Sequence, residues 1–149
     1  MIVHKANRTL EVWRGGAVCL CLPIALGSQP VGPKRCQGDG KTPEGDYIAC
    51  TRNEKSKYHR SIGISYPNRA DAALARADRI IDEMQYNGIT TALSAGARPP
   101  WDTALGGEIM IHGGGTSSDW TAGCIALQDE DMDLLWELVP VGAEITILP

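Results

Sequence analysis

Short apolar runs separated by glycine and polar breaks dominate this sequence and limit what it can fold into. The first three runs, at 2–5, 9–14 and 17–26, are separated by Ala-Asn-Arg and by Gly-Gly. Breaks of two or three residues between such runs are typical of β-hairpins. The chain also has 17 glycines, 9 prolines and no phenylalanine, which favours many tight turns over long helices. We therefore expect a sheet to dominate the fold.

Five further strand-like runs extend this pattern through the rest of the chain. They lie at 46–51, 60–66, 108–112, 123–127 and 143–148. Two long segments rich in glycine or proline, 27–42 and 88–107, lack apolar periodicity and are predicted to be loops. Because binding loops commonly surround a compact scaffold, we expect these two segments and the helix between them to form the walls of a cleft.

Two segments have the spacing of amphipathic helices. Over 70–87 apolar residues recur at intervals of three and four; Asn68 can cap the start, and Gly88 stands where a left-handed residue ends a helix. A shorter helix is predicted over 130–138, capped by Asp129. The expected fold is therefore mainly β, a sandwich-like or barrel-like mixed sheet with two packed α-helices.

Length and composition indicate one globular domain. The chain has 149 residues, of which 43% are hydrophobic and 21% charged, and no composition shift or internal repeat marks a linker, so 1–149 is assigned to a single domain. The formal charge is −4 and no run of lysine or arginine occurs, which argues against nucleic-acid binding. We expect a monomer.

The sequence shows no membrane-spanning or export segment. Its longest apolar run, 17–26, contains a proline and is shorter than the about 20 residues that cross a bilayer. The first residues lack the basic region, apolar region and small-residue cleavage site of a secretory signal. We expect either a cytoplasmic protein or a chain that begins after a removed leader.

A histidine and a cysteine at the ends of two predicted strands form a candidate catalytic pair. His112 ends an apolar run and precedes three glycines, whereas Cys124 follows a glycine at the start of the next run. If these strands are neighbours, the imidazole can take the thiol proton, which matters because a free thiol with a pKa of about 8.5 is mostly protonated at neutral pH. Spacing alone also allows a structural core histidine and a buried, inert cysteine.

The residues around the pair also carry a family resemblance. Ile111-His112-Gly113, followed by Thr121-Ala122-Gly123-Cys124-Ile125, resembles the active-site signature of the YkuD-type L,D-transpeptidase catalytic domain. The segments 65–68 and 107–112 look most like the murein transpeptidase branch related to YafK. The likeness continues in order along most of the chain, in the segments 2–27, 41–47 and 141–145.

This resemblance implies a role for each residue of the signature. Cys124 is the implied nucleophile, His112 its base, and the Gly113 carbonyl orients the imidazole. The residues implied to shape the substrate pocket are Thr121, Gly123, Trp120 and Gly114. The thiolate would attack the third residue of a peptidoglycan stem peptide, expel the terminal D-alanine and form a thioester, which an amine or water then resolves. No cofactor or metal is implied.

The resemblance leaves the exact activity and the location open. An amine acceptor gives an L,D-transpeptidase, water gives an L,D-carboxypeptidase, and a domain that only binds cell-wall peptides is a third alternative. The substrate implies the cell envelope, although this sequence shows no leader.

One position departs from the family pattern. Many members have an arginine two places after the cysteine, but this chain has Ala126 there. An anionic stem peptide needs a cation to meet its carboxylates. We expect that cation to be Arg98, Lys34, Arg35 or Lys41.

Four cysteines lie outside the signature. Cys19, Cys21, Cys36 and Cys50 have spacings that do not fit common zinc patterns. We expect buried thiols packed as small apolar groups, with a disulfide or a zinc site as alternatives.

Overall fold

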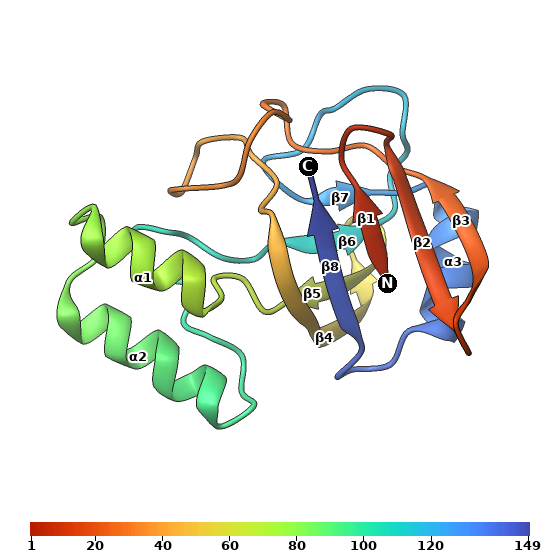
Figure 1. Ribbon diagram of the computed structural model, residues 1–149. Helices are drawn as coiled ribbons and strands as arrows, with labels where there is room; N and C mark the ends of the chain where they lie inside the picture. Colours follow the sequence, from red (N-terminus) through yellow and green to blue (C-terminus); the bar gives the residue numbers. More distant parts are fainter.

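The computed structural model describes all 149 residues and contains eight strands and three helices (Figure 1). The strands are β1 (Ile2–His4), β2 (Thr9–Arg14), β3 (Ala17–Pro23), β4 (Gly45–Ser56), β5 (His59–Ile64), β6 (Met110–His112), β7 (Ile125–Ala126) and β8 (Glu144–Leu148). The helices are α1 (Arg69–Ala77), α2 (Glu83–Ser94) and α3 (Asp129–Leu138). The expected mainly β mixed sheet is confirmed, but the chain has three helices where two were expected.

All eight strands belong to one sheet, in the order β3-β2-β1-β8-β4-β5-β6-β7. Most neighbours are antiparallel, but β1 runs parallel to β8, and β6 runs parallel to β7. The long strand β4 pairs with β8 through its first residues and with β5 through its later ones, so the sheet turns along β4 (Figure 1). This turn wraps the sheet around a core and leaves β7 at one edge.

The segment after β3 joins the two edges of the sheet. The strand expected over 17–26 ends at Pro23, and Ala25 then forms a bridge to Ala126 of β7, with N–H···O distances of 2.8 and 2.9 Å. Gly27 forms a second bridge, to Thr121. Since β3 and β7 are the edge strands, these bridges give the sheet its barrel-like closure.

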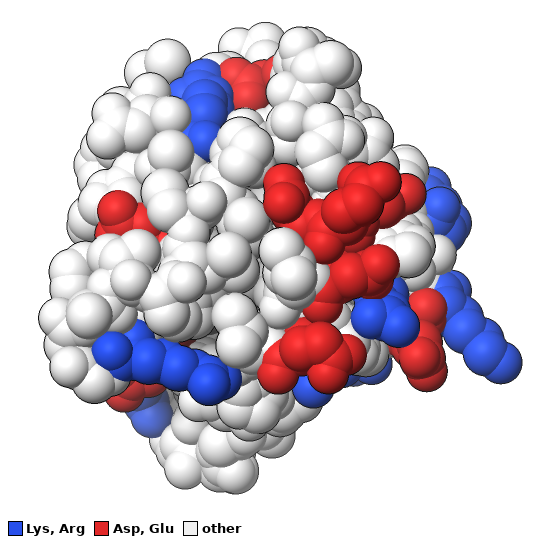
Figure 2. All heavy atoms as spheres, turned by 90° about the vertical axis from the view of Figure 1, so that its right-hand side faces the viewer, with Lys and Arg blue, Asp and Glu red and all other residues white.

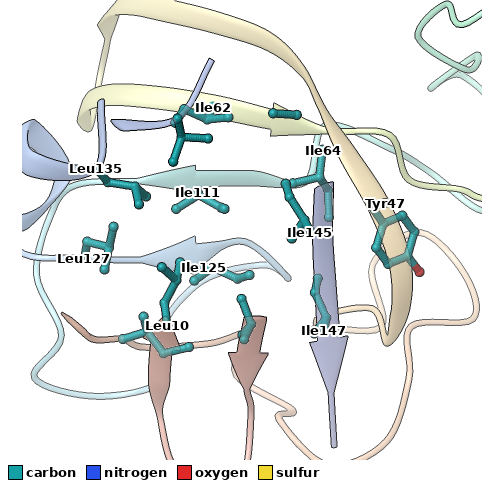
Figure 3. Packing of buried hydrophobic residues seen from close by; sticks show 14 of the residues in the cluster. Leu10, Tyr47, Ile62, Ile64, Ile111, Ile125, Leu127, Leu135, Ile145 and Ile147 are labelled. Atoms are coloured by element: carbon teal, nitrogen blue, oxygen red, sulfur yellow. The ribbon is translucent and has the colours of Figure 1, made fainter. Parts of the chain in front are cut away.

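The main core contains 20 buried apolar side chains. Figure 3 shows side chains of β5, β6 and β7 lying across from those of β8, with Leu135 of α3 at one side. Isoleucine and valine suit a pleated, half-buried surface, which explains why these runs form strands. Full burial of such a side chain contributes roughly 1.5–3 kcal/mol relative to exposure. The strand that carries His112 is therefore fixed by the centre of the core.

The single helix expected over 70–87 is wrong, because the chain forms two helices there. Asn68 caps α1 as expected: its side chain accepts the N–H of Asp71, and its own N–H donates to the Asp71 carboxylate, both at 2.9 Å. Asp82 and Gln85 form a second reciprocal pair of this kind at the start of α2. Such a capping box satisfies donors that a helix start leaves free, so it begins a new helix despite the continuous apolar period.

The second helix start changes two further expectations. Gly88 lies inside α2 instead of beyond a helix end, and 88–94 is largely helical instead of part of a loop. The α1–α2 hairpin stands at one side of the sheet (Figure 1). It has a small core of its own, formed by Ala72, Ala75, Ile81, Ile89 and Leu105.

The last helix also differs at its start. Gln128 occupies the cap position expected for Asp129, and its side chain makes no capping bond. The Asp129 carboxylate accepts the N–H of Gly114 at 2.8 Å instead, which ties the start of α3 to the loop after β6. Acidic residues in a first helical turn suit the helix dipole. Figure 2 shows a band of acidic side chains on the side of the molecule that carries α3.

The cysteines outside the signature are all free. Cys50 is half-buried, but Cys19, Cys21 and Cys36 are exposed, so core packing of these three thiols was a wrong expectation. Cys19 and Cys21 lie on the outer face of the edge strand β3, because the alternate positions face the core. No three His, Cys, Asp or Glu side chains gather in a way that could hold a metal ion, and no helix is long and apolar enough to span a membrane.

Candidate active site

His112 ends β6 and is almost entirely buried, with 3% of its surface exposed. It pairs with Ser61 of β5 on one side and with Ala126 of β7 on the other. Its Nδ1 lies 2.6 Å from the Gly113 carbonyl oxygen. Because a carbonyl oxygen only accepts hydrogen bonds, we assign the proton to Nδ1, which leaves Nε2 as the acceptor nitrogen of the ring. This tautomer suits a general base that acts through Nε2.

Cys124 immediately precedes β7, the parallel neighbour of β6. Its Sγ accepts the N–H of Met110 at 3.4 Å and lies 3.6 Å from the Glu108 carbonyl oxygen, to which the thiol donates. Both contacts are with the backbone at the start of β6 and just before it. The thiol is therefore held against the strand that carries the imidazole.

The turn before Cys124 is built by two other residues of the signature. The Thr121 hydroxyl donates to the Cys124 carbonyl oxygen at 2.8 Å and accepts the N–H of Gly123 at 3.1 Å. Gly123 has a φ of +133°, and a Cβ there would lie 2.6 Å from the Lys41 carbonyl oxygen. Only glycine tolerates this conformation and this approach. Thr121 and Gly123 thus shape the turn that presents the thiol.

Asp119 anchors the loop between His112 and Cys124. Its carboxylate binds Arg8 of the β1–β2 turn, at 2.7 Å for the shortest contact, and accepts the N–H of Leu26. Partial burial opposes ionisation, but the bonds from Arg8 and Leu26 hold the pKa of the Asp119 carboxyl below its ordinary value. The ionised carboxylate therefore ties this loop to the N-terminal strands at neutral pH.

Two aromatic side chains enclose the imidazole. Tyr58, in the tight turn between β4 and β5, stacks on the His112 ring with centroids 4.7 Å apart and planes 21° apart. Trp120 meets the same ring edge-on at 5.6 Å and meets Tyr58 at 5.2 Å. The sequence predicts Trp120 as a residue of the site, because it lies next to the Thr121–Cys124 motif. Tyr58 does not, because only the pairing of β5 with β6 brings it to this place.

Burial governs the protonation of the pair. It lowers the pKa of the His112 imidazole and outweighs the bond to the Gly113 carbonyl, while the Lys57 ammonium lowers that pKa further. Burial raises the pKa of the Cys124 thiol and outweighs the Met110 N–H and the Lys34 charge, both of which favour the thiolate. At neutral pH both groups are therefore uncharged. This state suits transfer of the thiol proton during attack rather than a preformed ion pair.

A hollow of about 310 Å³ opens beside Cys124. Both predicted loops line it, the segment 27–42 through Lys34, Gln37 and Gly38, and the segment 88–107 through Trp101, Gly106 and Gly107. No residue of a helix lines it, so the expectation that the intervening helix forms a wall is wrong. That hairpin instead borders a separate hollow of about 610 Å³, against β4 and β8.

One of the four candidate cations lies in the hollow that contains Cys124. Lys34 is 4% exposed, and its Nζ donates to the Cys36 carbonyl oxygen and to Asp39, each at 2.9 Å. Arg98 lies over the Trp101 ring, 4.3 Å from its centroid. The Nζ of Lys41 binds the Val31 carbonyl oxygen. Arg35 does not line the hollow beside Cys124; it borders a small separate hollow near α1, which Lys34 also lines. Ala126 is fully buried in β7.

Comparison with known proteins identifies the family of this chain. The chain matches the family model of the YkuD L,D-transpeptidase catalytic domain over residues 1–147. No curated protein matches it. Among solved structures, it resembles Pgp2, the helical cell shape determining protein of Campylobacter jejuni, with a TM-score of 0.67 and 21% identity over 98% of this chain and 46% of that one.

Two other solved structures have the same fold. Bd1075 of Bdellovibrio bacteriovorus gives a TM-score of 0.61 and 19% identity over 99% of this chain and 46% of that one. L,D-transpeptidase 1 of Mycobacterium tuberculosis gives a TM-score of 0.55 and 15% identity over 99% of this chain and 60% of that one. This chain thus spans less than two thirds of each of the three proteins, and identities this low show the fold alone.

The family match covers nearly the whole chain and includes both residues of the candidate pair. It confirms the resemblance seen in the signature and supports a function related to peptidoglycan. This chain belongs to the family of YkuD L,D-transpeptidase catalytic domains.

Proposed function

We propose that this domain is an L,D-transpeptidase, a cysteine acyltransferase that acts on peptidoglycan stem peptides with Cys124 as nucleophile and His112 as base. One arrangement supports this most strongly: two adjacent parallel strands hold a thiol beside an open hollow and an imidazole whose Nδ1 binds the Gly113 carbonyl. That bond takes the place of the carboxylate that orients histidine in a serine triad. A free Nε2 then accepts the thiol proton.

The proposed reaction has two halves. In the first, the Sγ of Cys124 attacks the carbonyl carbon of the third stem residue while the thiol proton passes to Nε2 of His112. The carbon–nitrogen bond to D-alanine breaks, and the proton on Nε2 moves to the leaving amine. In the second half, an acceptor amine gives a proton to Nε2 and attacks the thioester carbonyl carbon. The carbon–sulfur bond breaks, and the proton on Nε2 returns to the leaving sulfur, which restores the Cys124 thiol. Water in place of the amine gives a carboxypeptidase.

Intact-mass measurement after exposure to a carbapenem, which resembles the acyl donor of the family, tests the nucleophile. We expect the wild-type mass to increase by one carbapenem and the Cys124→Ala variant to stay unmodified. Cys36→Ala is the matched control, since it removes an exposed free thiol from the neighbouring loop, and it should react like the wild type. An adduct on Cys124→Ala, or none on the wild type, contradicts the proposal.

The products from purified muropeptides identify the acceptor. A transpeptidase joins two stem peptides, and a carboxypeptidase shortens tetrapeptides to tripeptides. A domain that only binds cell-wall peptides leaves both unchanged. The proposal requires cross-linked products, and these must be absent with Cys124→Ala.

We propose Lys34 as the cation that receives the carboxylate of the donor peptide. Two of the three ammonium donors are used by Cys36 and Asp39, which leaves one N–H for a ligand in the hollow beside Cys124. Asp39 also accepts the N–H groups of Arg35, Cys36 and Lys41, so the loop fixes the ammonium in place. The overall charge of −4 makes such a local cation necessary for an anionic substrate.

Lys34→Gln is therefore expected to slow acylation by a tetrapeptide donor by about tenfold or more, because a charge-assisted hydrogen bond is lost. Lys41→Gln is the matched control on the same loop and should retain the wild-type rate, as should Arg35→Gln and Arg98→Gln. An uncharged donor analogue should react equally with Lys34→Gln and the wild type. Because Lys34 is buried, thermal unfolding of each variant checks the fold. Equal tetrapeptide rates for all four variants contradict this assignment.

A further inference from the structure

The imidazole of His112 is packed between two aromatic rings that come from different parts of the chain. Tyr58 covers one face, and Trp120 meets the ring edge-on. We call Tyr58 and Trp120 the aromatic clamp. The Trp120 Nε1 donates to the Gly115 carbonyl oxygen at 3.1 Å, so this member of the clamp is fixed to the loop after β6.

The turn that carries Tyr58 is held from two sides. The N–H of Gly113 donates to the Tyr58 carbonyl oxygen at 3.0 Å, which ties the backbone of Tyr58 to the residue after His112. On the other side, His59 and Arg60 contact the Asp133 carboxylate of α3 at 2.7 and 3.1 Å. The ring of Tyr58 is therefore placed by its own backbone and by its neighbours.

The glycines after His112 make this packing possible. A Cβ on Gly113 would lie 2.3 Å from the Asp129 carboxylate and 3.0 Å from the Tyr58 carbonyl oxygen. A Cβ on Gly114, whose φ is +104°, would lie 3.2 Å from the Trp120 ring. Any larger residue would push the clamp away from the imidazole.

We propose that Tyr58 is a positioning residue for the acyl transfer, because its ring fixes the plane of the His112 imidazole and keeps water from it. The inference rests on the proposed function. The ring torsion of histidine is broad and roughly two-fold, so the bond from Nδ1 to Gly113 holds one edge of the ring, and a second contact is needed to fix its plane. A face-stacked tyrosine supplies that contact and keeps Nε2 directed at the thiol, as a general base requires.

The clamp also bears on the charge of the imidazole. Burial is the main cause of the lowered pKa of His112, and Tyr58 covers one face of its ring. Lys57, on the same turn, is the charged group that lowers this pKa further, and His59 and the Asp129 carboxylate lie beside the neighbouring Gly113. Removing the tyrosine ring admits water, which should raise the pKa of His112 toward its ordinary value.

The experiment compares Tyr58→Ala, Tyr58→Leu and Tyr58→Phe with a control. Tyr86→Ala is the matched control: Tyr86 is a half-buried tyrosine of α2 with the Arg76 guanidinium over its ring, as Lys57 lies over Tyr58. Two quantities are measured for each variant: the saturating rate and half-saturating concentration of carbapenem acylation, and the pKa of His112 by NMR titration. His4→Gln and His59→Gln spectra assign the imidazole signals, since the chain has 3 histidines.

We expect Tyr58→Ala and Tyr58→Leu to lower the saturating rate by roughly tenfold to 100-fold, with an unchanged half-saturating concentration and a raised His112 pKa. Tyr58→Phe and Tyr86→Ala should behave like the wild type. If Tyr58→Ala does not fold, Tyr58→Leu decides with the same readouts. An unchanged rate, or a slower rate with an unchanged His112 pKa, overturns the proposal. The NMR titration of His112 does not depend on catalysis. A wild type that forms no adduct therefore refutes the proposed function, whereas the titration still tests the role of Tyr58.

Discussion

Replacing His112 with glutamine is expected to slow acylation of Cys124 by about 10²–10⁴-fold, the range that a positioned general base contributes. Burial holds the thiol protonated at neutral pH, because it raises the pKa of Cys124. Without a base, only the small fraction of Cys124 that is ionised to the thiolate can attack the acyl donor. His4→Gln is the control, since His4 lies in β1, where its side chain contacts the Glu11 carboxylate and takes no part in the proposed reaction. A wild-type rate in His112→Gln would leave His112 with a structural role only.

The same base sets the pH dependence. Burial lowers the pKa of His112, so the ring remains a neutral base at pH values below its ordinary pKa of about 6.5. The acylation rate of the wild type should therefore fall only as the pH drops through this lowered pKa. The rate of His112→Gln should show no such acid limb. Stability should depend on pH in the same direction. In the unfolded chain the His112 imidazole has its ordinary pKa and is protonated at a higher pH than in the folded chain. The free energy of unfolding therefore decreases as the pH falls from about 6.5 through the folded pKa.

Lys5→Met is expected to lower the free energy of unfolding by about 3–5 kcal/mol, the usual cost of breaking a buried ion pair. The Lys5 side chain is 2% exposed, and its Nζ binds the Glu44 carboxylate at 2.7 Å and the carbonyl oxygens of Gly32 and Thr42 at 2.8 and 3.0 Å. Methionine fills the space but leaves these three acceptors unpaired. Urea unfolding measures the loss.

Two variants control this measurement. Arg76→Met breaks the pair with Glu83, whose side chains are 42% and 65% exposed, and should cost at most about 1 kcal/mol because water screens the charges. The double variant Lys5→Met with Glu44→Gln should recover part of the loss, since it removes the unpaired buried charge. A loss in Lys5→Met no larger than in Arg76→Met would show that the ammonium is dispensable.

The elements that sequence predicts well are those whose cause is local. Alternating apolar residues and short breaks identify the strands, and the spacing from His112 to Cys124 is carried by one continuous segment. The divided helix also had a local signal, the Asp82-x-x-Gln85 capping box, but the apolar period continues across it. The Asp129 cap fails for another reason, because its carboxylate is taken by Gly114 from a different loop.

Other parts of the site depend on contacts between distant segments, which no local pattern encodes. Tyr58 reaches His112 only because β5 pairs with β6. Lys34 is one of four plausible cations in the sequence, and its burial beside Asp39 distinguishes it from the other three. Sequence thus predicts the pair that carries the proposed chemistry, whereas the residues that position it and receive substrate follow from tertiary structure.

The parallel pairing of β1 with β8 has a consequence for the order of folding. The strand β8 is the only one that lies between β1 and β4. Without it, only the backbone bridges from Ala25 and Gly27 connect the halves β3-β2-β1 and β4-β5-β6-β7. Pairing strands from opposite ends of a chain is slow, because a long loop must close first. During synthesis, the His112 and Cys124 strands therefore leave the ribosome before the N-terminal hairpins can dock against β8. Completion of the sheet must therefore await β8, the last of the eight strands in chain order.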